Sequence, residues 1–265
     1  MIKDITISQY LPGDSFIHKL DPRTKILIAL MFIVCLFVID KFIGYTFVVA
    51  FLILVVYIAK IQPRFLYKGL KPVFFLILLT SILNIFMLRG GNLVFELGFI
   101  KIYDEGIKTA LFMSIRLILL IMGTSILTLT TSPIELTDGI EKLLKPIGKE
   151  IAHELAMMMT IALRFIPTLI DETDKIMKAQ KARGADFETG GLVQKAKSLI
   201  PLLVPLFISS FRRADELAMA MEARCYRGGA GRIRMKVLKF TSKDFIAFGV
   251  FSIILIGSIA VRFLA

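Results

Sequence analysis

Residues 42–59 read FIGYTFVVAFLILVVYIA, an apolar run without a single charged side chain. A helix needs about 20 residues of this kind to cross the hydrocarbon core of a bilayer. Comparable apolar runs occur at about 26–39, 72–88, 106–130 and 244–264. The sequence therefore predicts an all-α, polytopic membrane protein with about five transmembrane helices.

The composition agrees with this class and argues against others. Of the 265 residues, 56% are hydrophobic and 20% are charged. A platform for nucleic acid would interleave basic and aromatic residues, and the sequence has no such stretch, so no nucleic-acid partner is expected. Cys35 and Cys225 are too few and too differently placed for a disulfide framework, and both are predicted to be unpaired thiols. The first apolar run begins too late for a signal peptide, so the chain is expected to keep its N-terminus.

Basic residues are unevenly distributed among the connections between the apolar runs. Residues 131–242 carry eighteen lysines and arginines. Further basic residues precede the first run and follow the second run: Lys3, Lys19, Arg23, Lys25, Lys60, Arg64, Lys68 and Lys71. The opposite connections hold Lys41, Arg89 and Lys101, with acidic residues close to the last two. Cytoplasmic connections carry the basic excess, which predicts a cytoplasmic N-terminus and an external C-terminus.

The same distribution predicts the division of the chain. We expect an N-terminal membrane domain with four transmembrane helices at 1–130, a cytoplasmic domain of amphipathic helices at 131–242, and a C-terminal transmembrane helix at 243–265. The first apolar run is short, and Arg23 and Lys25 are expected to snorkel from its end toward water.

The cytoplasmic domain begins with a clear helix signal. Ser132 can cap a helix, Pro133 suits its first position, and the helix is predicted to end at about Leu144. Two apolar stretches follow at 155–170 and 199–211.

Both of these apolar stretches are interrupted. The first contains Arg164 and Pro167, and the second contains Pro201 and Pro205. We expect them to lie at the membrane interface or to pack against each other, each running into an amphipathic helix.

The two amphipathic helices are related by a weak repeat at an offset of 41 residues. The repeat pairs Asp174 with Asp215, Ala179 with Ala220, Ala182 with Ala223, and Arg183 with Arg224. The helices therefore end alike, in Ala182-Arg183-Gly184 and in Ala223-Arg224-Cys225. A glycine after the last helical residue and an arginine in the last turn make an ordinary helix stop. Alternatively, each arginine enters a groove of a partner and pairs there with a carboxylate.

Other residues leave two interpretations open. Methionines gather in the same segment, at Met157, Met158, Met159, Met177, Met219 and Met221. They either fill a core or form a compliant surface that repacks as a partner moves.

Arg116 and Asn84 are polar residues inside the apolar runs for which a role is predicted. Arg116 is expected to face protein rather than lipid, with a structural role favoured over a role in transport. Asn84 is expected to join helices by hydrogen bonding.

Enzyme signatures are missing from the sequence. It has no phosphate-binding loop and no dinucleotide fingerprint, and His18 and His153 have no zinc-site partners nearby. We therefore expect no catalytic residue, no cofactor and no metal site. His18 is expected to be an interfacial hydrogen-bonding residue.

Several motifs together resemble the T component of energy-coupling factor (ECF) transporters, which are ABC-type importers of vitamins and other micronutrients. The resemblance covers nearly the whole chain. It rests on residues 10–15 (YLPGDS), 18–25 (HKLDPRTK), 130–133 (TTSP), 143–146 (LLKP), 163–167 (LRFIP), 179–184 (AQKARG) and 221–224 (MEAR).

This resemblance implies a role as a non-catalytic coupling protein in the plasma membrane of a prokaryote. Its partners would be two cytoplasmic ABC-type ATPase subunits and a small membrane protein that binds the substrate, the S component. Residues 182–184 and 223–225 would dock in grooves of the ATPases, although Cys225 departs from the Ala-Arg-Gly pattern. Arg164, Pro167 and Arg116 are candidates for coupling or for structural roles within the membrane.

Two other classes of membrane protein fit the sequence less well. A self-sufficient secondary transporter or channel would need paired ionisable residues near the midplane and related transmembrane repeats. Away from the ends of the apolar runs, Arg116 is the only charged residue, and the repeat lies outside these runs. A membrane enzyme would need a catalytic constellation, which the sequence does not provide.

Overall fold

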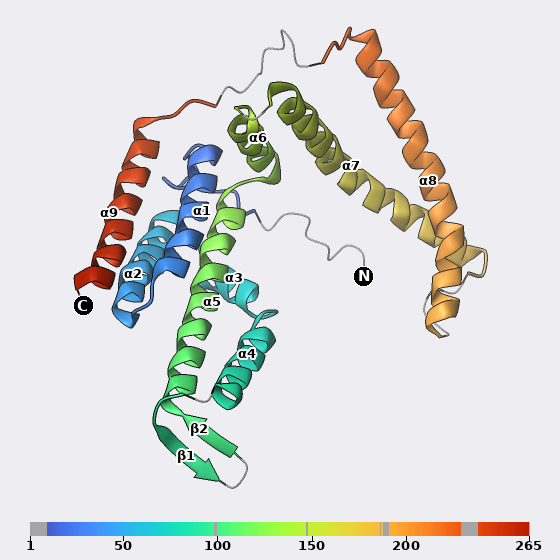
Figure 1. Cartoon of the computed structure of the whole chain (residues 1–265). Helices are drawn as coiled ribbons and strands as arrows, with labels where there is room; N and C mark the ends of the chain where they lie inside the picture. The colour runs from blue at the N-terminus through green and yellow to red at the C-terminus, as the bar shows by residue number, and fades with distance from the viewer. Residues whose placement is uncertain are drawn as a thin grey trace. The chain divides into compact units, whose positions relative to one another are not determined.

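The computed structural model describes residues 10–88, 90–97, 100–146, 148–185, 187, 191–228 and 238–264. Lys3, Arg89 and the basic stretch at 229–237, which enter the orientation prediction, lie outside these residues. Figure 1 labels the elements. In chain order they are α1 (Pro22–Val38), α2 (Phe42–Ala59), α3 (Pro63–Leu70), α4 (Phe74–Met87), β1 (Leu93–Leu97), β2 (Ile100–Tyr103), α5 (Asp104–Thr130), α6 (Pro133–Leu144), α7 (Lys149–Ala182), α8 (Leu192–Ala223) and α9 (Ser242–Leu264).

The chain divides into two compact units. One, here called the membrane unit, contains the described residues up to Gly139 and those from Leu238 onward. The other, here called the hairpin unit, contains the described residues from Ile140 to Gly228.

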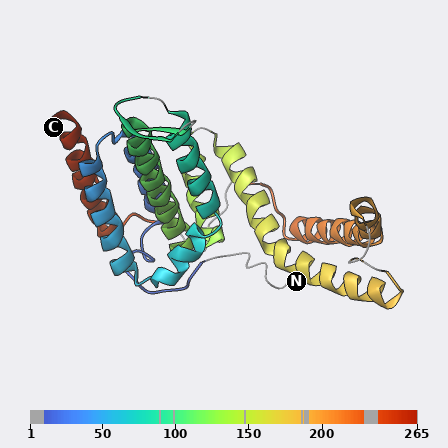
Figure 2. The ribbon, with the colours of Figure 1, turned by 90° about the horizontal axis from the view of Figure 1, so that it is seen from below.

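The membrane unit is built around α5 and α9, which each pack against α1 and α2, while α4 packs against α5. Figure 2 shows α5 with α4 on one side and α2 and α9 on the other. Leu36, Val48 and Phe251 are almost fully buried where α1, α2 and α9 meet. Because lipid tails are as apolar as these side chains, close van der Waals packing rather than removal from water holds the three helices together.

The number of apolar helices matches the prediction. Among the described residues, α2, α5, α7 and residues Ser242–Val261 of α9 are long and apolar enough to cross a membrane. The pair α3 and α4, bent by 56°, is a fifth candidate span when counted as one, with α3, which carries Arg64 and Lys68, as its polar end. The prediction of an all-α polytopic membrane protein with about five spans is therefore confirmed.

One of these five helices differs from the predicted set. α1 has 17 residues, the lower end of the range for a spanning helix, and is not among the five, whereas α7, which was predicted to lie outside the bilayer, is long and apolar enough. The cytoplasmic location of α7 stays a prediction, which rests on the charge distribution and on Arg164 within its apolar half.

A short β-hairpin interrupts the helical pattern and was not predicted. β1 and β2 are antiparallel, with Leu93 opposite Tyr103 and Leu97 opposite Ile100. Residues 93–103 are rich in β-branched and aromatic types around Gly98 in the sequence, which is the composition of a hairpin.

Asp21 and Pro22 start α1 and link it to α9. The Asp21 carboxylate accepts hydrogen bonds from the Arg23 backbone N–H at 2.9 Å and from the Arg23 guanidinium at 3.0 and 2.8 Å. The backbone N–H of Asp21 donates to Asp244 Oδ1 at 2.8 Å, and the Arg23 guanidinium lies 3.9 Å from the centre of the Phe240 ring. An acidic cap with proline at the first helical position is a favoured helix start.

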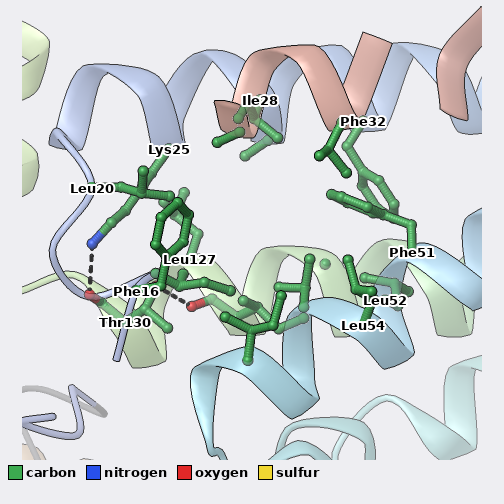
Figure 3. Close-up of a pocket in the computed structure, with 18 of the residues that line it drawn as sticks. Phe16, Leu20, Lys25, Ile28, Phe32, Phe51, Leu52, Leu54, Leu127 and Thr130 are labelled. Atoms are coloured by element: carbon green, nitrogen blue, oxygen red, sulfur yellow. Dashed lines mark hydrogen bonds between the residues drawn. The ribbon is translucent and has the colours of Figure 1, made fainter. Parts of the chain in front are cut away.

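Lys25 is buried rather than directed to water. Its Nζ donates to the carbonyl of Thr130 at 2.9 Å, as Figure 3 shows, and to the carbonyl of His18 at 3.2 Å. The expectation that Arg23 and Lys25 snorkel is therefore wrong. Each cation finds acceptors inside the membrane unit, which satisfies the charge without water.

α4 and α5 pack closely through small and polar residues. A Cβ on Gly106 would lie only 3.1 Å from the Asn84 carbonyl oxygen, so a larger residue would require the two helices to shift apart by a few tenths of an ångström. Ser81 and Ser114 share a hydrogen bond of 2.7 Å between the two helices. The prediction that Asn84 joins helices is wrong, because its side chain donates to the Thr80 carbonyl within α4 at 2.9 Å.

α6 begins as the sequence predicts. Ser132 Oγ accepts a hydrogen bond from the backbone N–H of Glu135 at 3.3 Å, and the helix runs from Pro133 to Leu144.

Candidate docking site

The end of α7 presents Arg183 on a glycine-stabilised turn. Gly184 has a φ of 87°. Its N–H donates to the Lys181 carbonyl, and the next N–H, from Ala185, reaches back to the Gln180 carbonyl, both at 3.0 Å. This is the Schellman arrangement, which satisfies the last carbonyls of a helix. The predicted helix stop is confirmed here, and Arg183 is exposed at its tip.

The end of α8 adopts the same turn with a different residue. Cys225 takes the place of Gly184 and has a φ of 55°. Its N–H donates to the Glu222 carbonyl at 2.8 Å, and that of Tyr226 donates to the Met221 carbonyl at 3.0 Å. A non-glycine residue in this region costs about 1–2 kcal/mol. The turn that presents Arg224 is therefore kept despite a strain that glycine would remove.

Three contacts show that α7 and α8 form an antiparallel pair. From the connection outward, Gln180 Nε2 donates to the Pro201 carbonyl at 3.4 Å, Arg213 pairs with Glu172 at 2.5 Å, and the Tyr226 hydroxyl lies 3.3 Å from His153 Nε2. Later positions of α8 thus contact earlier positions of α7. The two arginine tips consequently lie at opposite ends of the pair (Figure 1).

The distance between the tips follows from the helix rise. Pro201, which contacts Gln180 close to the first tip, lies 23 residues before Arg224. At 1.5 Å per residue this is about 35 Å along the axis. One groove of a globular partner does not span that distance, so the two arginines can engage two separate grooves.

The ion pair between Glu172 and Arg213 joins equivalent positions of the repeat. The two residues are 41 positions apart, which is the offset that relates Arg183 to Arg224. Each partner of the pair therefore lies eleven residues before its own arginine tip. Both side chains are partly buried, at 35% and 25% exposure. The pair fixes the register in which the two halves of the repeat meet.

α8 exposes an extended apolar surface, here called the α8 apolar face. Among its described hydrophobic side chains only Leu202 is buried, at 6% exposure. The exposed members are Val193, Leu199, Ile200, Leu203, Val204, Phe207, Ile208, Phe211 and Met219. Contiguous apolar surface of this kind marks a site for protein or membrane contact.

The methionines of this unit divide between the two interpretations. Met158, Met159 and Met219 are exposed, at 57%, 40% and 61%. Met157, Met177 and Met221 are half-buried. The exposed three do not fill a core, which favours a compliant surface for them.

Arg164 and Pro167 both lie on the exposed surface of α7. Pro167 has no N–H to donate to the Leu163 carbonyl, which leaves one gap in the helical hydrogen bonds. Both residues lie in the same helix as the first tip, 19 and 16 residues before Arg183.

Arg116 faces protein within the membrane unit. Its Nε donates to the Tyr45 hydroxyl at 3.0 Å, and its terminal nitrogen donates to the Ile39 carbonyl at 3.1 Å. The guanidinium also lies 5.0 Å and 5.3 Å from the ring centres of Phe112 and Phe37. Ile39 directly follows α1, so Arg116 completes the end of that helix.

His18 and the cysteines agree with their predictions. Nδ1 of His18 lies 2.6 Å from Ser15 Oγ, and Nε2 lies 3.0 Å from the Leu11 carbonyl. Its interpretation as a hydrogen-bonding residue is confirmed. Cys35 and Cys225 are both free thiols within this chain, the first buried and the second exposed.

Sequence reasoning missed the position of His153. Its Nδ1 lies 3.5 Å from a carboxylate oxygen of Glu141, and its Nε2 contacts the hydroxyl of Tyr226. It thereby connects α7 to the end of α6 and to the segment after the second tip. The histidine had been weighed only as a metal ligand, and no local pattern indicates a contact with a residue 73 positions away.

The chain is similar to known transport proteins over most of its length. A family model described as CbiQ, cobalt transport protein, matches residues 13–236. A protein of Clostridium kluyveri is 68% identical over 250 residues, which are 93% of each chain. A protein of Thermosediminibacter oceani is 59% identical over 99% of this chain and 100% of its own.

A third relative, from Bacillus subtilis, is 48% identical over 92% of this chain and 93% of its own. All three relatives carry the name energy-coupling factor transporter transmembrane protein EcfT. The similarity includes the residues of both arginine tips, because the family match extends through residue 236.

Proposed function

Since this chain belongs to the CbiQ family and is a T component, the transmembrane protein of an ECF transporter, we propose that it couples two ATPase subunits to an S component. In this role it neither binds nor hydrolyses ATP. Its two arginine tips dock in the ATPases, and substrate enters through the S component. The substrate is a vitamin or another micronutrient.

The observation that carries the proposal is the matched geometry of the two tips. Arg183 and Arg224 are both exposed, both follow an alanine, and both stand on the same type of helix-ending turn. An arginine guanidinium forms bidentate hydrogen bonds with a carboxylate, worth about 1.5–3 kcal/mol for a charged pair. Two equal devices about 35 Å apart by helix rise suit two equal partner subunits.

The antiparallel pair of α7 and α8 transmits the motion of the ATPases to the rest of the transporter. ATP-driven closure brings the two ATPases together, and each pulls on one arginine. α7 and α8 pack against each other and are also joined by the Glu172–Arg213 pair, so the motion of the tips moves the two helices together. The α8 apolar face and the exposed methionines contact the S component, where flexible side chains can repack as it moves.

Identification of the bound chains tests the proposal. The full chain is purified from native membranes in mild detergent, and the proteins that remain bound are identified by mass spectrometry. We expect two ABC-type ATPase chains and a small hydrophobic protein. Substrate uptake by liposomes containing this chain alone, without ATP, would instead support a self-sufficient transporter.

A further inference from the structure

A groove lies beside the end of α2, away from the arginine tips and within the membrane unit. Its volume is about 660 Å³. Leu52, Val56 and Leu66 line it together with Met122 of α5, so that α2, α3 and α5 all contribute. Nothing in the proposed coupling role uses this groove.

The apolar part of the groove faces the surroundings of α2. Ile53 and Tyr57 line it and are 65% and 84% exposed. Both lie in the uninterrupted apolar run of α2, which crosses the bilayer. Side chains at this level contact lipid tails, because no water is present in the hydrocarbon core.

The other end of the groove is cationic. Lys60 lines it, with a φ of 55° that turns the chain directly after α2. Pro63 also lines it, and Arg64 follows in the first turn of α3. Residues 41–95 contain no aspartate or glutamate. Among the described residues, neither Lys60 nor Arg64 forms an ion pair with a carboxylate.

α3 places these cations at the depth of lipid headgroups. It buries Leu66 and exposes Arg64, Tyr67 and Lys68, and it is bent by 56° relative to the apolar α4. A short amphipathic helix of this kind lies in the interface, with its polar face toward the headgroups. The groove therefore runs from the headgroup level into the hydrocarbon level.

A second cavity in the same unit provides a comparison. It has a volume of about 460 Å³ and is lined almost entirely by apolar side chains, including Phe32 and Phe51 (Figure 3). The cation in its lining is Lys25, whose ammonium donates to two backbone carbonyls. Among the described residues that line this cavity, none forms a cationic rim at the membrane surface. The groove differs because it has both an apolar floor and a cationic rim.

We propose that the groove between α2, α3 and α5 binds one anionic phospholipid, with its phosphate on Lys60 and Arg64 and an acyl chain along Leu52, Val56 and Met122. The charge of the rim selects an anionic headgroup, and the apolar floor requires a tail. Basic pockets between transmembrane helices bind anionic headgroups for the same reason.

Native mass spectrometry of the full-length chain tests the cationic half of the site. The protein is transferred into mixed micelles that contain phosphatidylglycerol and phosphatidylcholine, and the retained lipids are counted. We expect one retained phosphatidylglycerol, and a loss of about tenfold in its occupancy in K60Q/R64Q. The matched control is K239Q/K243Q, which removes the same charge from exposed residues near the start of α9 and should leave the occupancy unchanged.

A second pair of variants tests the apolar half. Ile53→Trp fills the groove, whereas Ile43→Trp adds the same bulk at an exposed position of α2 outside it. Only the first should reduce the retained lipid, with both variants eluting as folded protein in size exclusion.

Four results would overturn the proposal. The first is an equal loss of retained lipid in K60Q/R64Q and K239Q/K243Q, and the second is equal retention of phosphatidylcholine and phosphatidylglycerol. The third is an equal loss of retained lipid in the two tryptophan variants, and the fourth is displacement of the lipid by millimolar inorganic phosphate. The last result would indicate a simple anion site rather than a lipid site.

Discussion

The membrane unit and the hairpin unit differ in how their arginines and lysines are paired and in how much buried apolar core each contains. In the membrane unit, Lys25 and Arg116 donate to carbonyls and a hydroxyl of the same chain. Some of its apolar residues form a buried core between α1, α2, α5 and α9, while others, such as Ile53 and Ile253, are exposed. In the hairpin unit, Arg183 and Arg224 are exposed, and so is most of the apolar side of α8.

This difference separates a self-sufficient part from an incomplete one. Polar groups that are buried and paired stabilise the chain that contains them. Exposed arginines on ordered turns and exposed phenylalanines contribute little to folding, but they are the residue types that dominate interfaces between proteins. Substitutions in the membrane unit should therefore change stability, whereas substitutions at the tips should change assembly.

The largest effect on stability is expected at Lys25. Lys25→Met keeps the length of the side chain but leaves the carbonyls of His18 and Thr130 without their donor. Loss of one buried and one partly buried hydrogen bond from this cation costs about 3 kcal/mol together, which corresponds to a fall of about 10 °C in Tm. Thermal unfolding of the protein in detergent measures it.

Lys19→Met provides the control, because the Lys19 side chain is 53% exposed. We expect its Tm to stay within about 1 °C of the unchanged protein, as for other surface substitutions. Equal Tm values for the two variants would mean that the hydrogen bonds of Lys25 do not stabilise the membrane unit.

A smaller effect is expected where the two tips differ. Cys225→Gly removes the strain of a positive φ and should stabilise the last turn of α8 by about 1 kcal/mol, while Gly184→Ala should destabilise the last turn of α7 by a similar amount. Amide hydrogen exchange in each last turn should slow about fivefold in the first variant and accelerate about fivefold in the second. Exchange that changes in the same direction in both variants would contradict an equivalent geometry.

The smallest effect is expected for the Glu172–Arg213 ion pair of the hairpin unit. The side chains of Glu172 and Arg213 are partly exposed, so their interaction should contribute only about 0.5 kcal/mol. A double-mutant cycle with Glu172→Gln and Arg213→Gln measures this coupling, and high salt should reduce it.

The neighbouring Asp171→Asn serves as the control for the cycle, because Asp171 is exposed. Its coupling to Arg213→Gln should be close to zero. A coupling as large as that of Glu172 would show that general charge, rather than the contact, holds the two helices in register.

Much of the fold could be predicted because membrane helices follow from local sequence. The apolar runs located α2, α5 and α9 within a few residues, and the Ser132-Pro133 signal located α6. The β-hairpin at 93–103 was not predicted, because transmembrane helices are located from long apolar runs and short strand patterns do not enter that prediction.

The contacts of charged residues were harder to predict than the helices. Lys25 finds its acceptor at Thr130, 105 residues away, and a rule about helix ends suggested snorkelling instead. His153 and Tyr226 are likewise distant in sequence. By contrast, the turns that carry Arg183 and Arg224 are local structures, and their helix stops were predicted from a few adjacent residues.

The double substitution R183A/R224A tests the central claim most directly. Its control is K178A/R212A, which removes two exposed positive charges from the same helices, away from the tips. ATPase chains that copurify with this protein in mild detergent are quantified for both variants.

We predict that ATPase recovery falls by about 100-fold or more in R183A/R224A, because each arginine contributes about 1.5–3 kcal/mol, while the small hydrophobic partner is still recovered. The control should recover ATPases as the unchanged protein does. Full ATPase recovery with R183A/R224A would contradict the account and leave the two arginines as helix stops only.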